Sequence, residues 1–167
     1  MAHPAIEMYN YHVWANRTML DRLKELPRDI YEKEIPSVFP SISKVMPHIY
    51  ITDCCWFDIL SGKSMNEAMA ASRQLQELAE TSSIEELQSL FHESSEKYQA
   101  FFSRQESMDK TIVLDNPYAG IRDTSYSEIV LQVVNHGTYH RGNITAMIRQ
   151  QGLASTMTEY GLYWYSK

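Results

Sequence analysis

The sequence predicts an all-α protein built as a four-helix bundle. Four segments place apolar residues at steps of three and four, and none sustains the alternation of a half-buried strand. Two of these segments begin with a Ser-x-x-Glu capping box, which marks the N-terminus of a helix. The links are long, and 167 residues suit one domain, so we expect a single bundle domain over residues 1–167.

The first predicted helix covers about 5–26 and ends before Pro27. Its apolar residues recur mostly at helical steps: Met8, Tyr11, Val13, Trp14, Met19, Leu20, Leu23 and Leu26. The second predicted helix covers about 41–60, and Gly62 follows it as a C-terminal stop. Pro47 lies inside this second segment, so the helix either starts later than residue 41 or is kinked at the proline.

The third predicted helix begins at the capping box Ser83-Ile84-Glu85-Glu86 and runs to about residue 107. The fourth begins at Ser125-Tyr126-Ser127-Glu128 and runs to residue 151, with Gly152 as its C-cap. Between these helices we expect a short helix at 66–71 and a short extended piece at 111–114. The chain ends in a tail whose aromatic residues are expected to pack on the bundle: Tyr160, Tyr163, Trp164 and Tyr165.

Composition excludes several classes of protein. The 15 Lys and Arg against 21 Asp and Glu give a net charge of -6, which opposes binding to nucleic acid or to an anionic membrane surface. Cys54 and Cys55 are adjacent, a spacing that fits neither a disulfide nor a CxxC zinc or redox motif. The N-terminus lacks a signal-peptide pattern, and no apolar run is long enough to span a bilayer. We therefore expect a cytoplasmic protein.

Two histidines in the fourth helix carry the strongest chemical signal. His136 and His140 are four residues apart, so their side chains lie one above the other on the helix surface. They fall near the centre of an apolar stripe: Ile129, Val133, Gly137, Ile144 and Met147. Polar rings facing the core need partners. The pair is either hydrogen-bonded to neighbours or part of a metal site, which needs at least a third ligand.

His48 in the second helix is the best candidate for that third ligand. It lies in phase with an inward stripe of its own helix: Val45, Thr52, Cys55 and Ile59. If this stripe faces the bundle axis, His48 meets the pair across it. His12, beside Tyr11 and Trp14, is a weaker candidate for the same place. His3 near the terminus and His92 beside Glu93 are given no role.

Several motifs resemble those of the DinB/YfiT-like metalloenzyme family. His136-Gly137-Thr138-Tyr139-His140-Arg141-Gly142-Asn143-Ile144 is similar to that family's H-x-x-x-H-R-G-x-I signature. Tyr11-His12-Val13-Trp14-Ala15-Asn16 resembles its first-helix Y-x-x-W-A-N. The segment His48 to Trp56 resembles its second-helix histidine followed by an acidic and an aromatic residue, and Arg149-Gln150-Gln151-Gly152 with the Tyr-rich tail is similar to its ending.

The resemblance implies a divalent metal held by His48, His136 and His140, and an up-down-down-up bundle that forms a homodimer. Imidazole ligands suit zinc, nickel, iron(II) or copper. Zinc or nickel is the first expectation, with iron or manganese as alternatives. Two positions depart from the family pattern. Pro47 stands where a regular helical residue is usual, and it affects the direction in which His48 points. Glu159 stands at the acidic position of the tail and is given no role.

Three imidazoles with an open fourth position are typical of a catalytic metal site. The metal would activate either water or a thiol, so we expect a small-molecule hydrolase or a low-molecular-weight-thiol S-transferase. The substrate is expected to be a small molecule, with such a thiol as one candidate. The alternative is a non-catalytic metal- or ligand-binding bundle with a stress-response role. A nucleic-acid partner, which the family name suggests, is opposed by the charge and the lack of a basic cluster.

Four further residues lie close to the candidate ligands in the sequence. Asp53 lies about 140° around the helix from His48, which favours a surface role over a hydrogen bond to a ligand. Cys54 and Cys55 are interpreted as buried thiols and not as nucleophiles, because buried apolar thiols are more common. Arg141 either steers an anionic substrate or forms a salt bridge at a helix surface or interface. No general base can be identified from the sequence.

Overall fold

The computed structural model describes residues 3–166. The longest helices among these residues are α1 (Pro4–Lys24), α3 (Val45–Leu60), α6 (Ile84–Phe102) and α7 (Tyr126–Gln150). The shorter helices are α2 (Arg28–Glu32), η1 (Ile42–Lys44), α4 (Met65–Gln74), α5 (Gln76–Thr81) and α8 (Tyr160–Tyr163). Two strands, β1 (Thr111–Asn116) and β2 (Gly120–Ser125), form a hairpin.

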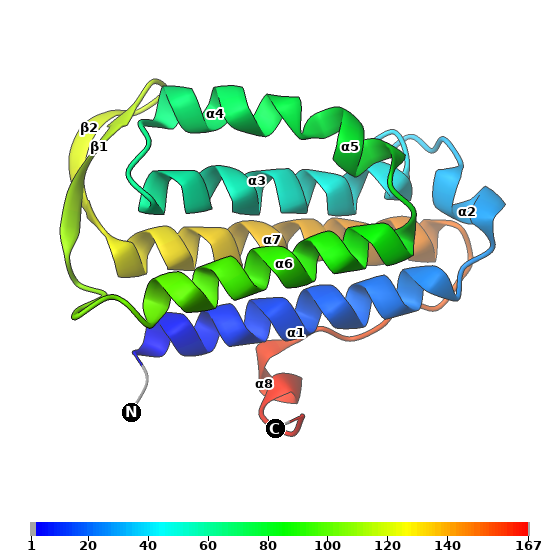
Figure 1. Cartoon of the computed structure of the whole chain (residues 1–167). Helices are drawn as coiled ribbons and strands as arrows, with labels where there is room; N and C mark the ends of the chain where they lie inside the picture. The colour runs from blue at the N-terminus through cyan, green and yellow to red at the C-terminus, as the bar shows by residue number, and fades with distance from the viewer. Residues whose placement is uncertain (1–2, 167) are drawn as a thin grey trace.

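The four long helices pack side by side around one core. Helix α1 contacts α6 and α7, and α3 contacts the same two helices from the other side. Helices α1 and α7 run in one direction along the bundle, and α3 and α6 run in the opposite one (Figure 1). Helices α4 and α5 lie over α3, the hairpin crosses one end, and α8 lies beside α1 (Figure 1). The buried residues form two main clusters and a smaller one between α1, α7 and α8.

The predicted helix ends are largely confirmed. Ser83 and Ser125 are the N-caps of α6 and α7, and each closes a capping box with the glutamate three residues later. Gly62 and Gly152 follow α3 and α7 with φ of 102° and 78°, the left-handed conformation that stops a helix. Helix α6 ends at Phe102, earlier than the predicted residue 107.

Pro47 lies in the first turn of α3, which begins at Val45. The backbone nitrogens of a first turn have no partner within the helix, so a proline there removes no hydrogen bond. The later start is therefore the correct reading of this segment, and η1 leads into it.

The chain is mostly helical, as predicted, but not entirely so. Strand β1 pairs antiparallel with β2 from Thr111 opposite Ser125 to Asn116 opposite Gly120, where only an extended piece at 111–114 was expected. Leu114 and Thr124 are buried, whereas Val113 and Ile121 are exposed. Because only a few side chains of the hairpin reach the core, its sequence lacks the alternation that would have predicted two strands.

The inward stripe predicted for α7 is confirmed for its apolar members and His140, which are buried. His136 is half-buried. The aromatic tail behaves differently from the prediction: Tyr163 is buried, but Trp164 is 60% and Tyr165 86% exposed. Tyr163 packs against Tyr11 and Trp14 of α1, whereas Trp164, just beyond α8, contacts Tyr160 of the tail itself.

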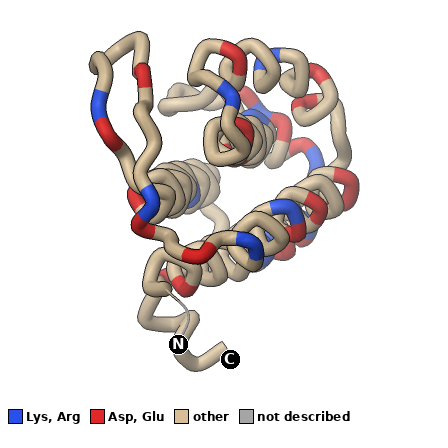
Figure 2. Tube along the Cα trace, turned by 60° about the vertical axis from the view of Figure 1, so that its left-hand side comes forward, with Lys and Arg blue, Asp and Glu red and all other residues tan. Residues whose placement is uncertain are grey.

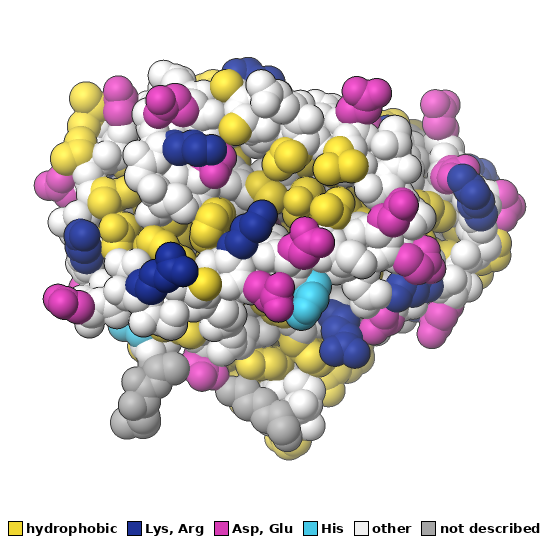
Figure 3. All heavy atoms as spheres, in the orientation of Figure 1, with side chains coloured by type: hydrophobic (Ala, Val, Ile, Leu, Met, Phe, Trp, Pro, Cys, Tyr) yellow, Lys and Arg dark blue, Asp and Glu magenta, His cyan; other side chains and the backbone are white. Residues whose placement is uncertain are grey.

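Basic and acidic residues lie interspersed along the helices and the hairpin (Figure 2). On the face seen in Figure 3, apolar side chains reach the surface between α4–α5 and α6, and charged side chains surround them. Within residues 3–166, no helix is both long enough and apolar enough to cross a bilayer.

Candidate metal centre

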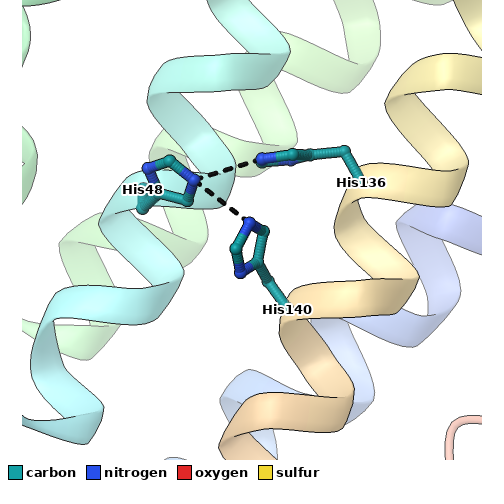
Figure 4. A group of neighbouring side chains, drawn as sticks. All are labelled: His48, His136 and His140. Atoms are coloured by element: carbon teal, nitrogen blue, oxygen red, sulfur yellow. Dashed lines mark hydrogen bonds between the residues drawn. The ribbon is translucent and has the colours of Figure 1, made fainter. Parts of the chain in front are cut away.

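The three predicted ligand histidines come together between α3 and α7. His48 lies near the start of α3, and His136 and His140 lie one turn apart on α7, the helix that packs directly against α3. Their rings point toward one another across the interface of the two helices (Figure 4). His48 is far from the pair in the sequence, and the packing of α3 on α7 brings the three residues together.

The ring nitrogens converge at a spacing that suits one ion. Nε2 of His48 lies 3.1 Å from Nε2 of His136 and 3.2 Å from Nε2 of His140. One ligand atom from each of the three residues fits within a mutual distance of 4.8 Å. Nitrogens bound to one tetrahedral zinc ion at about 2.0–2.1 Å lie about 3.3–3.4 Å apart. The cluster is therefore close to the spacing that a tetrahedral ion would require.

Hydrogen bonding among the rings cannot satisfy all three nitrogens. A neutral imidazole offers either a proton or a lone pair at Nε2, so three facing Nε2 atoms leave at least one pair of like groups in contact. A cation accepts all three lone pairs at once. The donor set thus fits a divalent metal better than it fits a hydrogen-bonded cluster.

The environment keeps the three rings neutral. Burial, together with the neighbouring rings of His140 and His48, lowers the pKa of His136 to about 3. Burial and the nearby His48 lower the pKa of His140 to about 4. Burial also lowers the pKa of His48, although Asp53 acts against it. Metal ligation needs deprotonated imidazole, so the lone pairs are available at neutral pH.

The nitrogens on the far sides of the α7 rings differ in their partners. Nδ1 of His140 lies 3.2 Å from the side-chain amide of Asn143. If Nε2 binds an ion, Nδ1 carries the proton, and the amide oxygen of Asn143 would accept it after a rotation of that amide. Nδ1 of His136 is buried and has no hydrogen-bond partner among the residues that the structure describes.

An aromatic side chain from the loop before α3 covers the cluster. The ring centroid of Phe39 lies 5.3 Å from that of His48 and 5.4 Å from that of His140. Beside them is a cavity of about 410 Å³, which His48 and Phe39 line together with Pro40, Lys44, Ile51, Gln76 and Glu80. Of the three histidines, His48 alone lines this cavity, so a small molecule has room next to His48.

A carboxylate shares this cavity with His48. Glu80 accepts hydrogen bonds from Lys44 at 2.5 Å and from Gln76 at 2.7 Å, and both bonds lower its pKa, that from Lys44 most. Glu80 and Lys44 are not predicted from the sequence, since α5 was not expected and nothing in the sequence links Glu80 to the histidines. Only the packing of α5 on α3 brings them there.

Two predictions about neighbouring residues are wrong. Asp53, expected at the surface, is 2% exposed, and its Oδ2 lies 2.8 Å from Nε2 of His12. Arg141, expected to steer an anion or form a salt bridge at a helix surface or interface, is 1% exposed and donates to Asn16 at 2.6 Å and Thr138 at 3.0 Å. Both side chains are enclosed because α3 and α7 are each covered on more than one side, which a single amphipathic stripe does not predict.

The weaker candidate ligand, His12, lies in this second network and not in the metal cluster. His3 caps α1, since its Nδ1 accepts a hydrogen bond from the backbone of Ala5 at 3.2 Å. His92 is exposed and lies 3.7 Å from Glu96. None of these three histidines joins the cluster.

The two cysteines are half-buried and unreactive in character. Burial raises the pKa of Cys54 to about 11, and burial also raises the pKa of Cys55. A thiol with a raised pKa is protonated at neutral pH and is a poor nucleophile. The interpretation of both residues as structural thiols is consistent with these pKa values.

The bundle and the three converging imidazoles define a class: helical proteins with a candidate histidine metal centre between two core helices. The chain belongs to the DinB family, whose family model matches residues 1–167. It is also 50% identical over 165 residues to Protein DinB of Bacillus subtilis (strain 168), an alignment that covers 99% of this chain and 96% of that protein. The predicted membership of this family is confirmed.

Proposed function

We propose that His48, His136 and His140 bind one divalent metal ion through their Nε2 atoms, with zinc or nickel as the preferred ions. The observation that carries this proposal is the convergence of three neutral imidazoles at 3.1 and 3.2 Å between α3 and α7. Membership of the DinB family supports it as well, because the ligands match the family's motif.

We propose further that the protein is a metal-dependent enzyme, a small-molecule hydrolase or a low-molecular-weight-thiol S-transferase. The cavity of about 410 Å³ at His48 supports an enzyme over a sealed structural site. When bound, the ion would act as a Lewis acid that turns water or a thiol into a better nucleophile near neutral pH.

The residues of this chain then have separate tasks. Phe39 shields one side of the imidazole cluster from solvent. Lys44 and Glu80 place one positive and one negative group at the wall of the cavity, where they orient a small polar substrate. The rim thus favours a substrate that carries both hydrogen-bond donors and acceptors.

We assign the chain to one domain, an up-down-down-up bundle that functions as a homodimer. The directions of the four long helices support the bundle assignment (Figure 1). We propose no nucleic-acid partner, because the net charge is -6 and the basic residues are interspersed with acidic ones (Figure 2).

Elemental analysis of untagged protein, purified without chelators, tests metal binding. The expected result is close to one zinc or nickel ion per chain, and a loss of most of that metal on His136→Ala. His92→Ala is the matched control, because His92 is exposed and lies outside the cluster. Equal metal content in the two variants, or none that can be restored to the unaltered protein, would contradict the proposal.

Activity is tested separately with a model ester and with a thiol-transfer pair, cysteine and 1-chloro-2,4-dinitrobenzene. The loaded protein should accelerate one of the two reactions, and chelation should abolish the effect. If a protein with full metal content accelerates neither, the non-catalytic metal- or ligand-binding bundle becomes the better account.

A further inference from the structure

A second cavity, with a different set of lining residues, lies between α1 and α6. It has a volume of about 430 Å³, within the range of small-molecule sites in proteins, and none of His48, His136 and His140 lines it. The middle of α6 turns Ser94 and Ser95 inward, where larger apolar residues fill the ends of the same face. Because these side chains are small, α6 and α1 pack without filling the space between them.

The walls of this cavity are mostly apolar, but its inner end is polar. The apolar walls come from Tyr9, Val13, Leu20 and Phe91, and the exposed residues Arg17 and His92 lie at its outer edge. The inner end is made by His12, Asn16 and Asp53, each at most 2% exposed. A buried polar group in an open space needs a partner.

The hydrogen bonds at the inner end fix the tautomer of His12. Arg141 Nη1 can only donate, so Nδ1 of His12, 3.3 Å away, accepts a hydrogen bond from it. The ring proton of His12 is then on Nε2, which donates to Oδ2 of Asp53 at 2.8 Å. Both nitrogens of His12 therefore have hydrogen-bond partners within the protein, and neither is free to bond a ligand in the cavity.

This arrangement leaves one acceptor and one donor open. Oδ1 of Asp53 is buried and has no hydrogen-bond partner within residues 3–166. The Nδ2 group of Asn16 lies 2.9 Å from Nε2 of His12, which already carries a proton and cannot accept another. Asp53 Oδ2 and Asn16 Nδ2 lie 2.8 and 2.9 Å from that one nitrogen, so the unpaired acceptor and the unpaired donor belong to two residues that meet at His12.

The charge of Asp53 is balanced within the protein. The Arg141 guanidinium bonds the opposite side of the His12 ring, and through the imidazole it compensates the carboxylate. A cationic ligand would bring a second positive charge to a site that already holds one. An uncharged ligand with a hydroxyl or amide group satisfies both open positions without a change in net charge.

We propose that the cavity between α1 and α6 is a second ligand site, which takes a small, uncharged and largely apolar molecule bearing a hydroxyl or amide. The hydroxyl donates to Oδ1 of Asp53 and accepts from Nδ2 of Asn16, while an aromatic or aliphatic body fills the space left by Ser94 and Ser95. This site shares no lining residue with the three-histidine cluster, so ligand binding here can be tested separately from the proposed enzyme activity.

Phenol and toluene are probes of nearly equal shape that differ in the hydroxyl. Titration of the full chain, followed by backbone amide NMR, should show saturable shifts of α1 and α6 residues with phenol. Phenol should bind at least about fivefold more tightly than toluene, because toluene leaves the acceptor and donor unpaired. Equal or tighter binding of toluene, or no saturable shifts with phenol, would overturn the proposal.

Cavity-filling variants complete the test. Ser95→Leu from α6 and Val13→Phe from α1 should each abolish phenol binding, and thermal unfolding will show which of them retains the fold. Ser89→Leu is the matched control: Ser89 lies on the exposed side of α6, and its hydroxyl, like that of Ser95, bonds a carbonyl of its own helix. Phenol binding should be unchanged in this control and in His136→Ala. Unchanged binding in both filling variants would contradict the assignment of the site.

Discussion

The imidazole of His12 occupies the space that a side chain at Gly137 would need: a Cβ at Gly137 would lie 2.3 Å from Cε1 of His12. The same Cβ would lie 2.8 Å from Nη1 of Arg141. Gly137 follows His136 on α7, so the buried network of α1 packs directly behind the histidine cluster. Because Gly137 has no side chain, the network around His12 can pack against α7 next to the histidine cluster.

Gly137→Ala should therefore destabilise the protein. We expect a loss of about 1–3 kcal/mol in the free energy of unfolding, since the new methyl group has to displace a buried ring. Urea denaturation measures it. Gly142→Ala on the same helix is the control, because a Cβ there meets nothing within 4 Å and should stabilise α7 by up to about 1 kcal/mol. Equal effects at the two glycines would contradict the close packing of His12.

Asp53→Asn tests the buried network on its own. The amide oxygen can still accept from His12, but the negative charge that balances Arg141 is lost. We expect the free energy of unfolding to fall by about 1.5–3 kcal/mol, the range for a hydrogen bond to a charged group. Asp58→Asn on the same helix removes only a surface pair with Lys63 and should cost about 0–1 kcal/mol. A smaller effect at Asp53 than at Asp58 would exclude the network as a source of stability.

The metal-free protein should lose stability as the pH falls. The folded-state pKa values of His136 and His140, about 3 and about 4, lie below the value of about 6.5 expected in the unfolded chain. Between these limits the unfolded state binds more protons, so lower pH favours unfolding. Urea titrations of the chelated protein from about pH 7 to about pH 5 measure the slope, in a range above most carboxylate titrations.

The slope should be smaller in His136→Ala and unchanged in His92→Ala, because His92 is exposed and outside the cluster. A slope that is identical in all three proteins would show that the buried rings do not bind protons on unfolding.

Cys54 should react slowly with iodoacetamide in the folded protein. Its pKa is raised to about 11, whereas an unfolded thiol titrates near about 8.5, so the folded state holds far less thiolate. In a Cys55→Ser background at mildly alkaline pH, we expect alkylation at least about tenfold slower than in urea. A native rate equal to the unfolded rate would instead mark Cys54 as an accessible nucleophile.

Local sequence signals predicted much of the helical framework. The capping boxes at Ser83 and Ser125 act within one turn, so they locate the starts of α6 and α7 without knowledge of the rest of the fold. Strand β2 and α5 were missed, and β1 was expected only as a short extended piece, because short elements that bury few side chains leave little periodicity. The same limit hid Glu80, which lies on α5.

The sequence by itself determined that His136 and His140 share one inward face of α7, since the period of a helix depends only on spacing. Tertiary structure decided which third histidine meets them: His48 joins the pair, whereas His12 is held by Asp53 and Arg141 on the other side of Gly137. Both histidines lie on amphipathic helices, and their surroundings depend on which neighbour each helix face packs against. That choice follows from contacts between residues far apart in the chain, which no local pattern encodes.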